Sequence, residues 1–148
     1  MLTRIAGLTL SVIFLGAGAM AQEMQVAKNA SCGCCAAWME RMQAQGFDVG
    51  AQNMDYDALY QLKVAAGVPE DMMGCHTARV AGYVIEGHVP SAEIRRLLEE
   101  APRAVGLAVP GMPAGAPGMD YGGQSEAFEV YLIAMDGTTS LYATYPAE

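Results

Sequence analysis

The chain has 148 residues, of which 53% are hydrophobic, and a formal net charge of −8 at pH 7. This length suits one domain with a single modest core and leaves no room for two. The negative charge argues against nucleic acid and anionic lipid as partners; it suits a cationic ligand, although acidic surfaces mostly serve solubility.

Residues 1–21 are typical of a secretory signal peptide. Arg4 supplies a positive charge, an uncharged apolar run covers residues 5–16, and Ala19-Met20-Ala21 offers a small-x-small cleavage pattern. The alternative, a retained membrane anchor, is disfavoured because glycines interrupt the run and no stop-transfer charges follow it. We therefore predict export by a cleaved signal, with no stable membrane span afterwards.

Apolar periodicity and turn residues predict alternating strands and helices after the signal. The predicted elements are a strand at 25–28, a helix at 32–45, a strand at 47–51, a helix at 55–66, either two strands that turn near 81–82 or one bent strand at 79–86, and a helix at 91–101. The order β-α-β-α-β-β-α predicts an α/β fold of the thioredoxin or glutaredoxin kind. In such a fold a mixed sheet carries flanking helices on both faces.

Helix-capping residues precede each predicted helix. Ser31 is expected to cap the first helix, Asp55 or Asp57 the second, and Ser91 the third. Gly46 is expected to end the first helix in a left-handed conformation.

A segment rich in glycine, proline and methionine starts at Gly106 and ends at Met119, and it predicts an ordered loop. A β-hairpin follows, joined through Asp136-Gly137, which either extends the sheet or forms a small lobe. The expected division is a signal peptide at 1–21, a thioredoxin-like domain at 22–105, and a methionine-containing loop with a C-terminal hairpin at 106–148, packed on the same domain.

The four cysteines are the strongest chemical signal. Cys32, Cys34 and Cys35 fall within four residues, and Cys75 follows much later. Cysteines of exported proteins usually form structural disulfides, but only one of the first three can pair with Cys75. The chain also has 11 methionines, and thiolates with thioethers select copper(I). A zinc site and the disulfides Cys32–Cys35 or Cys34–Cys75 remain alternatives.

The expected fold brings these sulfurs together. Cys32 and Cys35 have the Cys-x-x-Cys spacing at the start of the first helix, where backbone N–H groups and the helix dipole stabilise a thiolate. Cys34 would invite mispairing in a disulfide exchanger, whereas it makes sense as a metal ligand. The loop that carries Cys75 faces this turn in thioredoxin-like folds.

Other donors stand near the cysteines in the sequence. His76 is a candidate ligand or an orienting residue, and His88 is interpreted as a capping or packing residue at its turn. Met112 and Met119 are candidate outer ligands or a lid. No role is assigned to Met72 and Met73.

Several motifs, in order, resemble the periplasmic CopG copper-resistance family, which is distinct from the plasmid repressor of the same name. They are Cys32-Gly33-Cys34-Cys35 with Trp38, Gly46-Phe47, Gly67-Val68-Pro69, Cys75-His76-Thr77-Ala78, Gly82 to Pro90, and Gly106 to Met119. The chain departs from the family pattern at 26–31, which lack an aromatic residue and a proline, and at Ala116, where a serine is commoner. Neither departure touches a proposed ligand.

The resemblance implies a thioredoxin-like fold and a multinuclear copper site built on the four cysteines, with His76 and the methionine loop beside it. It also implies a periplasmic role in copper resistance or homeostasis, with cycling between copper(I) and copper(II) and other copper-handling proteins as partners. The alternative function is a thiol–disulfide oxidoreductase that uses Cys32 and Cys35. Whether the protein is an enzyme, a copper oxidoreductase, is left open.

Overall fold

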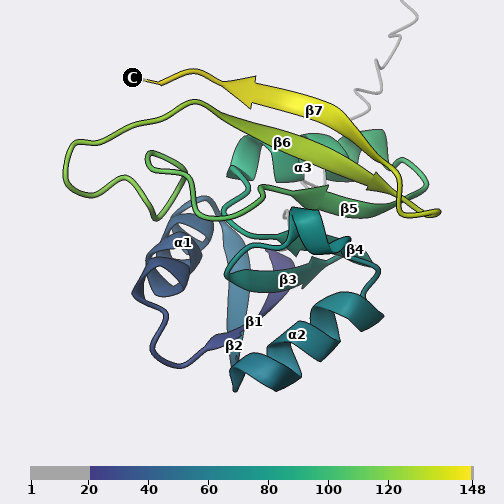
Figure 1. The fold of residues 1–148 in the computed structure, drawn as a ribbon, viewed down its shortest axis with the longest axis horizontal. Helices are drawn as coiled ribbons and strands as arrows, with labels where there is room; N and C mark the ends of the chain where they lie inside the picture. The colour runs from purple at the N-terminus through teal and green to yellow at the C-terminus, as the bar shows by residue number, and fades with distance from the viewer. Residues whose placement is uncertain (1–20, 148) are drawn as a thin grey trace, which may run out of the picture.

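The computed structural model describes residues 21–147, so the predicted signal peptide, apart from Ala21, lies outside the described residues. The described chain begins and ends with strands and carries its helices between them (Figure 1). In chain order the elements are β1 (Gln22–Asn29), α1 (Gly33–Ala44), β2 (Phe47–Met54), α2 (Tyr56–Ala65), the 3-10 helix η1 (Glu70–Met72), β3 (His76–Val80), β4 (Tyr83–Glu86), α3 (Ser91–Glu100), β5 (Ala104–Ala108), β6 (Phe128–Ala134) and β7 (Thr139–Tyr145). The predicted order β-α-β-α-β-β-α is confirmed. No helix within residues 21–147 is long and apolar enough to cross a membrane.

The strands of the described chain form one seven-stranded sheet in the order β2-β1-β3-β4-β5-β6-β7. The pairs β1–β2 and β4–β5 are parallel and the other pairs are antiparallel. The C-terminal hairpin therefore extends the edge of the sheet, which is one of the two arrangements its sequence left open. It lies across the top of Figure 1, on the side opposite α2.

The strand β5, which joins this hairpin to the rest of the sheet, was not predicted. Gly106 was expected in a loop as the first residue of the segment rich in glycine and proline that ends at Met119. The structure gives another reason for this glycine: a Cβ atom at residue 106 would lie 1.7 Å from the backbone oxygen of Val84. Here glycine permits a close approach between β4 and β5 instead of ending the strand.

Side chains alternate between the two faces of the sheet, and each face carries its own apolar cluster. Ile85 and Leu107 pack on the face covered by α1 and α3, where Trp38 of α1 is fully buried. Val84 and Ala108, their neighbours in sequence, point to the other face and pack with residues that follow α2. The predicted class, a thioredoxin-like mixed sheet with flanking helices, is confirmed.

Two of the predicted helix caps are wrong. The N-cap of α1 is Cys32, whose sulfur accepts the backbone N–H of Cys35 at 3.3 Å. Ser31 lies one residue before the cap, and its hydroxyl donates to the side chain of Asn29 at 2.7 Å. The N-cap of α3 is Pro90, without a side-chain hydrogen bond, and Ser91 is the first helical residue. Of the two candidate caps of α2, Asp55 is the one found: its carboxylate accepts the backbone N–H of Ala58.

Candidate metal centre

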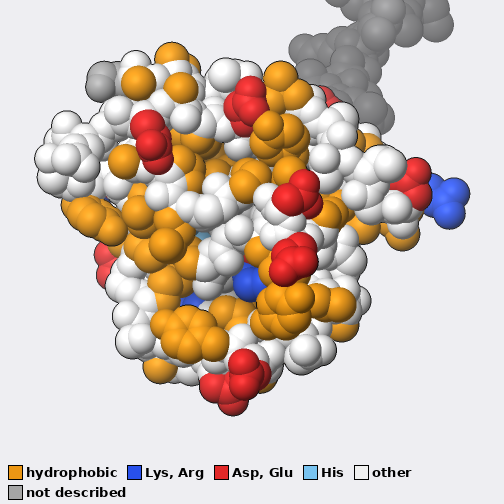
Figure 2. All heavy atoms as spheres, in the orientation of Figure 1, with side chains coloured by type: hydrophobic (Ala, Val, Ile, Leu, Met, Phe, Trp, Pro, Cys, Tyr) orange, Lys and Arg blue, Asp and Glu red, His pale blue; other side chains and the backbone are white. Residues whose placement is uncertain are grey.

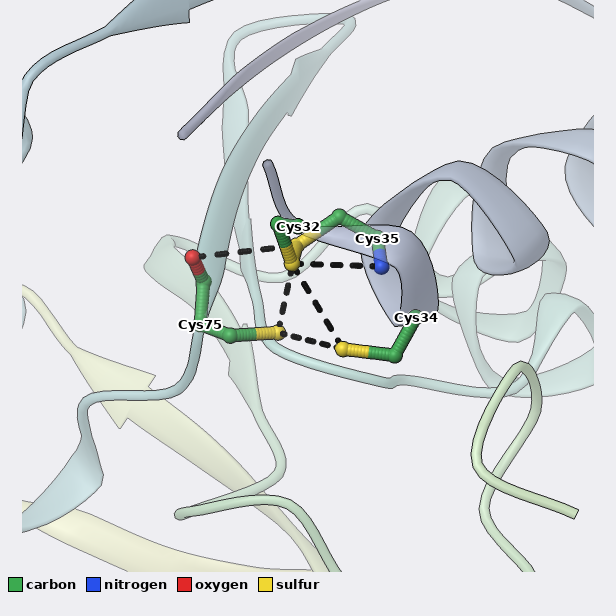
Figure 3. A group of neighbouring side chains, drawn as sticks. All are labelled: Cys32, Cys34, Cys35 and Cys75. Carbon is green, nitrogen blue, oxygen red and sulfur yellow. Dashed lines mark hydrogen bonds between the residues drawn. A yellow bond between two sulfur atoms is a disulfide. The ribbon is translucent and has the colours of Figure 1, made fainter. Parts of the chain in front are cut away.

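The structure brings all four cysteine sulfurs together at the N-terminus of α1 (Figure 3). Cys32, Cys34 and Cys35 come from the cap and first turn of this helix, and Cys75 reaches them from the segment just before β3. The sulfur of Cys75 lies 3.4 Å from that of Cys35 and 4.0 Å from that of Cys34. The sulfurs of Cys32 and Cys34 are 3.5 Å apart. The four atoms all lie within 4.8 Å of one another.

Cys32 and Cys35 are joined by a disulfide, and Cys34 and Cys75 are free thiols. This pairing is one of the alternatives that the cysteine spacing left open. Cys35 is fully buried, whereas Cys32 is half-buried. All four sulfurs become available as thiolate ligands only after the disulfide gains two electrons, so the oxidation state of the site controls how many ligands it offers.

Two buried histidines face the sulfur of Cys75. The Nε2 atom of His88 lies 2.9 Å from this sulfur, and the Nδ1 atom of His76 lies 3.3 Å from it. The other ring nitrogen of His88, Nδ1, lies 2.8 Å from the backbone oxygen of Pro117. Because a carbonyl oxygen only accepts, Nδ1 of His88 carries the hydrogen and Nε2 presents a lone pair to Cys75.

His76 completes this arrangement from the other side. Its ring packs on Trp38 with the ring centroids 4.4 Å apart, and its Nε2 atom is buried without a hydrogen-bond partner. An N–H group buried without an acceptor is costly, so the favoured tautomer of His76 has its hydrogen on Nδ1. This N–H donates to the sulfur of Cys75, and Nε2 keeps a lone pair without a partner. His88 therefore points an imidazole lone pair at the sulfur of Cys75, whereas His76 points an N–H group at the same sulfur.

His88 is the site residue that the sequence analysis missed, because it was interpreted as a packing residue. A signal for it exists in the β3–β4 hairpin, whose turn at Ala81 and Gly82 pairs Thr77 with Glu86. Extending the same register by two residues sets Cys75 opposite His88. The predicted turn near 81–82 thus contained the information that brings this imidazole to the cysteine.

The thiol and both imidazoles are held in their neutral forms. Burial, with the neighbouring Cys34 as a second cause, raises the pKa of Cys75 to about 12. Burial lowers the pKa of His88, and it lowers the pKa of His76 to well below the usual value. A metal ion that binds here must displace the proton of Cys75, whereas the imidazoles need not lose a charge.

The histidine burial predicts how the metal-free protein responds to acid. Both histidines have pKa values below the ordinary 6.5 in the folded state, so the unfolded chain binds protons first as the pH falls. Stability is then fully present above pH 6.5 and falls below it, by up to ~1.4 kcal/mol per pH unit for each histidine. Urea unfolding at pH 7.5, 6.5 and 5.5 measures this slope. The variant His76→Asn should show a shallower slope, and an equal slope in both proteins would contradict the assignment.

A buried ionic network fixes the segment that carries Cys75. The carboxylate of Glu86 is fully buried and accepts the backbone N–H of Gly74 at 2.8 Å. It also binds the ammonium of Lys63 from α2, and the hydroxyl of Thr77 at 2.7 Å. The position of Cys75 therefore depends on one buried carboxylate and its cation.

The loop between β5 and β6 closes over the start of α1. Gly118 lies so close to this helix that a Cβ atom would stand 2.8 Å from the backbone oxygen of Cys34. The next residue, Met119, has a sulfur that accepts the hydroxyl of Tyr121 at 3.7 Å. Met112 lies elsewhere on the loop and is 55% exposed. The two predicted outer ligands thus occupy different surroundings.

A cavity of about 640 Å³ opens beside the cysteines. Its lining includes Cys32, Cys75, Met73 and Met112, together with Tyr56, Tyr60 and Lys63 from α2. Met119 does not line it. Figure 2 shows the face of the molecule over α2, where hydrophobic side chains gather and a basic side chain is visible between them. Half-buried Cys32 and Cys75 border this opening.

Comparison with known proteins supports the resemblance found in the motifs. A family described as a protein of unknown function, DUF411, matches residues 72–119. No curated protein matches the chain. Two solved structures, forms 2 and 1 of the copper resistance protein CopG, are each 40% identical to it with a TM-score of 0.78. They align with 85% of this chain and with 99% and 98% of their own lengths. Sequence and fold agree over most of both chains, and the protein therefore belongs to the CopG copper-resistance family.

Proposed function

We propose that this protein holds copper(I) in a cysteine-thiolate cluster and serves copper resistance or homeostasis. The observation that carries this proposal is the convergence of four cysteine sulfurs within 4.8 Å of one another. The printed name of the similar structures, copper resistance protein CopG, supports copper as the cargo. Thiolates are the soft ligands that copper(I) prefers.

The number of donors favours a multinuclear copper cluster over a single zinc ion. Sulfur spacings of 3.4–4.0 Å also suit one tetrahedral zinc ion, whose ligands at about 2.3 Å would stand roughly 3.8 Å apart. The spacing alone therefore does not select the metal. However, the four sulfurs have His88 and His76 beside them, and thioethers line the adjoining cavity. One tetrahedral ion would leave several of these donors unused, whereas thiolates that bridge several copper(I) ions can use them.

Each residue has a distinct part in this proposal. Cys32, Cys34, Cys35 and Cys75 supply the thiolates after the Cys32–Cys35 disulfide is reduced. His88 adds a nitrogen ligand at Cys75, for which its lone pair is already aimed. His76 and the loop methionines Met112 and Met119 stand around the cluster as outer groups. Cycling of the bound copper between copper(I) and copper(II) would make the protein a copper oxidoreductase.

We also propose that the protein acts in the periplasm, after removal of residues 1–21, and exchanges copper with other copper-handling proteins there. In this proposal, segments 22–105 and 106–148 work as one unit, because the later segment supplies the Pro117 carbonyl that orients His88. The mass of the protein recovered from the periplasm tests the cleavage. A full-length mass would contradict it.

Anaerobic copper loading tests the function directly. The reduced protein is mixed with copper(I) or zinc, freed of excess metal, and assayed for metal content and for thiols that react with an alkylating agent. The proposal predicts several copper ions per chain with all four thiols protected. Loading at one ion per chain for both metals would instead support a zinc-type site.

One observation favours a second candidate, a thiol–disulfide oxidoreductase. The disulfide joins half-buried Cys32 to fully buried Cys35, so an incoming thiolate can attack Cys32 while Cys35 leaves as the thiolate. A metal-free protein that reduces insulin disulfides, and that keeps this activity in Cys34→Ser, would support this candidate over the copper cluster.

A further inference from the structure

The cavity beside the cysteines contains two methionines that come from different segments. Met73 precedes the Gly74–Cys75 segment, and Met112 belongs to the loop after β5. The backbone N–H of Gly111 donates to the carbonyl of Met73 at 3.1 Å, and Gly74 and Gly111 form a parallel bridge. These backbone contacts hold the two methionines next to each other at the mouth of the site.

The same cavity is one opening to the cysteine cluster; another, of about 500 Å³, is lined by Cys32 and Cys34. The first is lined by Cys32 and Cys75 as well as by the two methionines, so two cysteines and two methionines border one space. Cys35 is fully buried and does not line it. Tyr56 and Tyr60 border the space, and Lys63, its nearby cation, is already paired with Glu86. Asn29, Ser31 and Asp57 also line the space, so its donors for a soft, weakly hydrated ion are the two methionines and the two cysteines.

We propose that Met73 and Met112 form a two-thioether acceptor site, at which a copper(I) ion is captured before it passes to Cys32 and Cys75. The inference rests on the proposed function and adds the route by which the cluster fills. A thioether carries no proton and binds copper(I) without the proton release that a thiol requires. The acceptor site can thus hold the ion while the thiols lose their protons, and no electron transfer is involved.

Methionine methyl NMR tests the acceptor site without relying on cluster formation. The variant Cys34→Ser/Cys75→Ser, with its Cys32–Cys35 disulfide intact and its methionine methyl groups labelled with carbon-13, is titrated with silver(I), a soft ion that does not change oxidation state. We expect the methyl signals of Met73 and Met112 to shift together at the first equivalent. Met135 is the matched control, because it is 60% exposed against 55% for Met112 and lies on the β6–β7 hairpin. Equal shifts at all three methionines, or none at Met73 and Met112, would overturn the proposal.

Uptake kinetics separate a failure of this inference from a failure of the proposed function. The reduced wild-type protein and Met73→Leu/Met112→Leu receive copper(I) from the same chelator, and the initial rate of copper transfer is recorded. We expect the double variant to load about tenfold more slowly and Met135→Leu to load at the wild-type rate. Equal rates in all three proteins would overturn the acceptor site, whereas a wild-type protein that takes up no copper would overturn the function itself.

Discussion

Substitution of Cys34 by serine is expected to reduce copper binding sharply. The sulfur of Cys34 stands between the two parts of the site, 3.5 Å from that of Cys32 and 4.0 Å from that of Cys75. A hydroxyl oxygen is a poor ligand for copper(I), so the variant loses one thiolate and the bridges it makes. We expect the affinity for copper(I) to fall about 100-fold or more, which exceeds the loss usually seen when only a supporting residue is changed. Anaerobic competition with a copper(I) chelator measures this loss.

The same variant separates the two candidate functions, because Cys34 is not part of the disulfide. A disulfide exchanger should keep its activity in Cys34→Ser, while a copper cluster should lose ions. Ala36→Ser is a suitable control, since Ala36 is an exposed residue of the same helix. Unchanged copper content in Cys34→Ser would remove Cys34 from the ligand set.

Substitution of Lys63 by methionine is expected to lower the free energy of unfolding by about 3–5 kcal/mol. The carboxylate of Glu86 is fully buried, and its pKa is already raised by that burial although Lys63, Thr77 and Gly74 oppose the shift. Without the ammonium, the buried group must either stay charged without its cation or take up a proton. Both outcomes cost stability, because charge burial without a partner is unfavourable. Urea unfolding of the copper-free protein measures the loss.

Two controls make the result specific to the buried pair. The double variant Lys63→Met/Glu86→Gln removes both charges and should recover most of the loss. Arg41→Met removes a cation from an exposed pair with Asp120 and should cost less than about 1 kcal/mol. A Lys63→Met protein as stable as the Arg41→Met protein would show that the buried pair does not hold this part of the fold.

Much of the fold was predictable from local pattern. The helix periodicity, the turn at Ala81 and Gly82, and the hairpin through Asp136-Gly137 each describe one element, and the structure confirms them. The strand β5 was missed because Gly106 begins a segment rich in glycine and proline, which is typical of a loop. The sequence does not show that Gly106 lies against the backbone of Val84 on the neighbouring strand. A close approach between two strands is a long-range contact, and the sequence of one segment alone does not reveal it.

The site was predictable in its residue types but less so in its geometry. The compressed cysteine triplet and the thioredoxin-like order were enough to expect Cys75 beside Cys32, Cys34 and Cys35. The position of His88 beside Cys75 was missed because it depends on hairpin register. Met73 received no role because the contact between Gly111 and Met73 links segments far apart in the chain. The spacing favoured a metal site but left the disulfide Cys32–Cys35 open, since a Cys-x-x-Cys pair at a helix start can also be oxidised.

X-ray absorption at the copper edge tests the central claim most directly, namely that the four cysteine sulfurs act together as one copper(I) site. The measurement uses the wild-type protein, reduced and loaded with copper(I) under anaerobic conditions. The cluster predicts the edge of copper(I), a first shell dominated by sulfur, and a short copper–copper distance from thiolate bridges. A first shell of nitrogen and oxygen, with no copper–copper scattering and with alkylatable thiols, would contradict it.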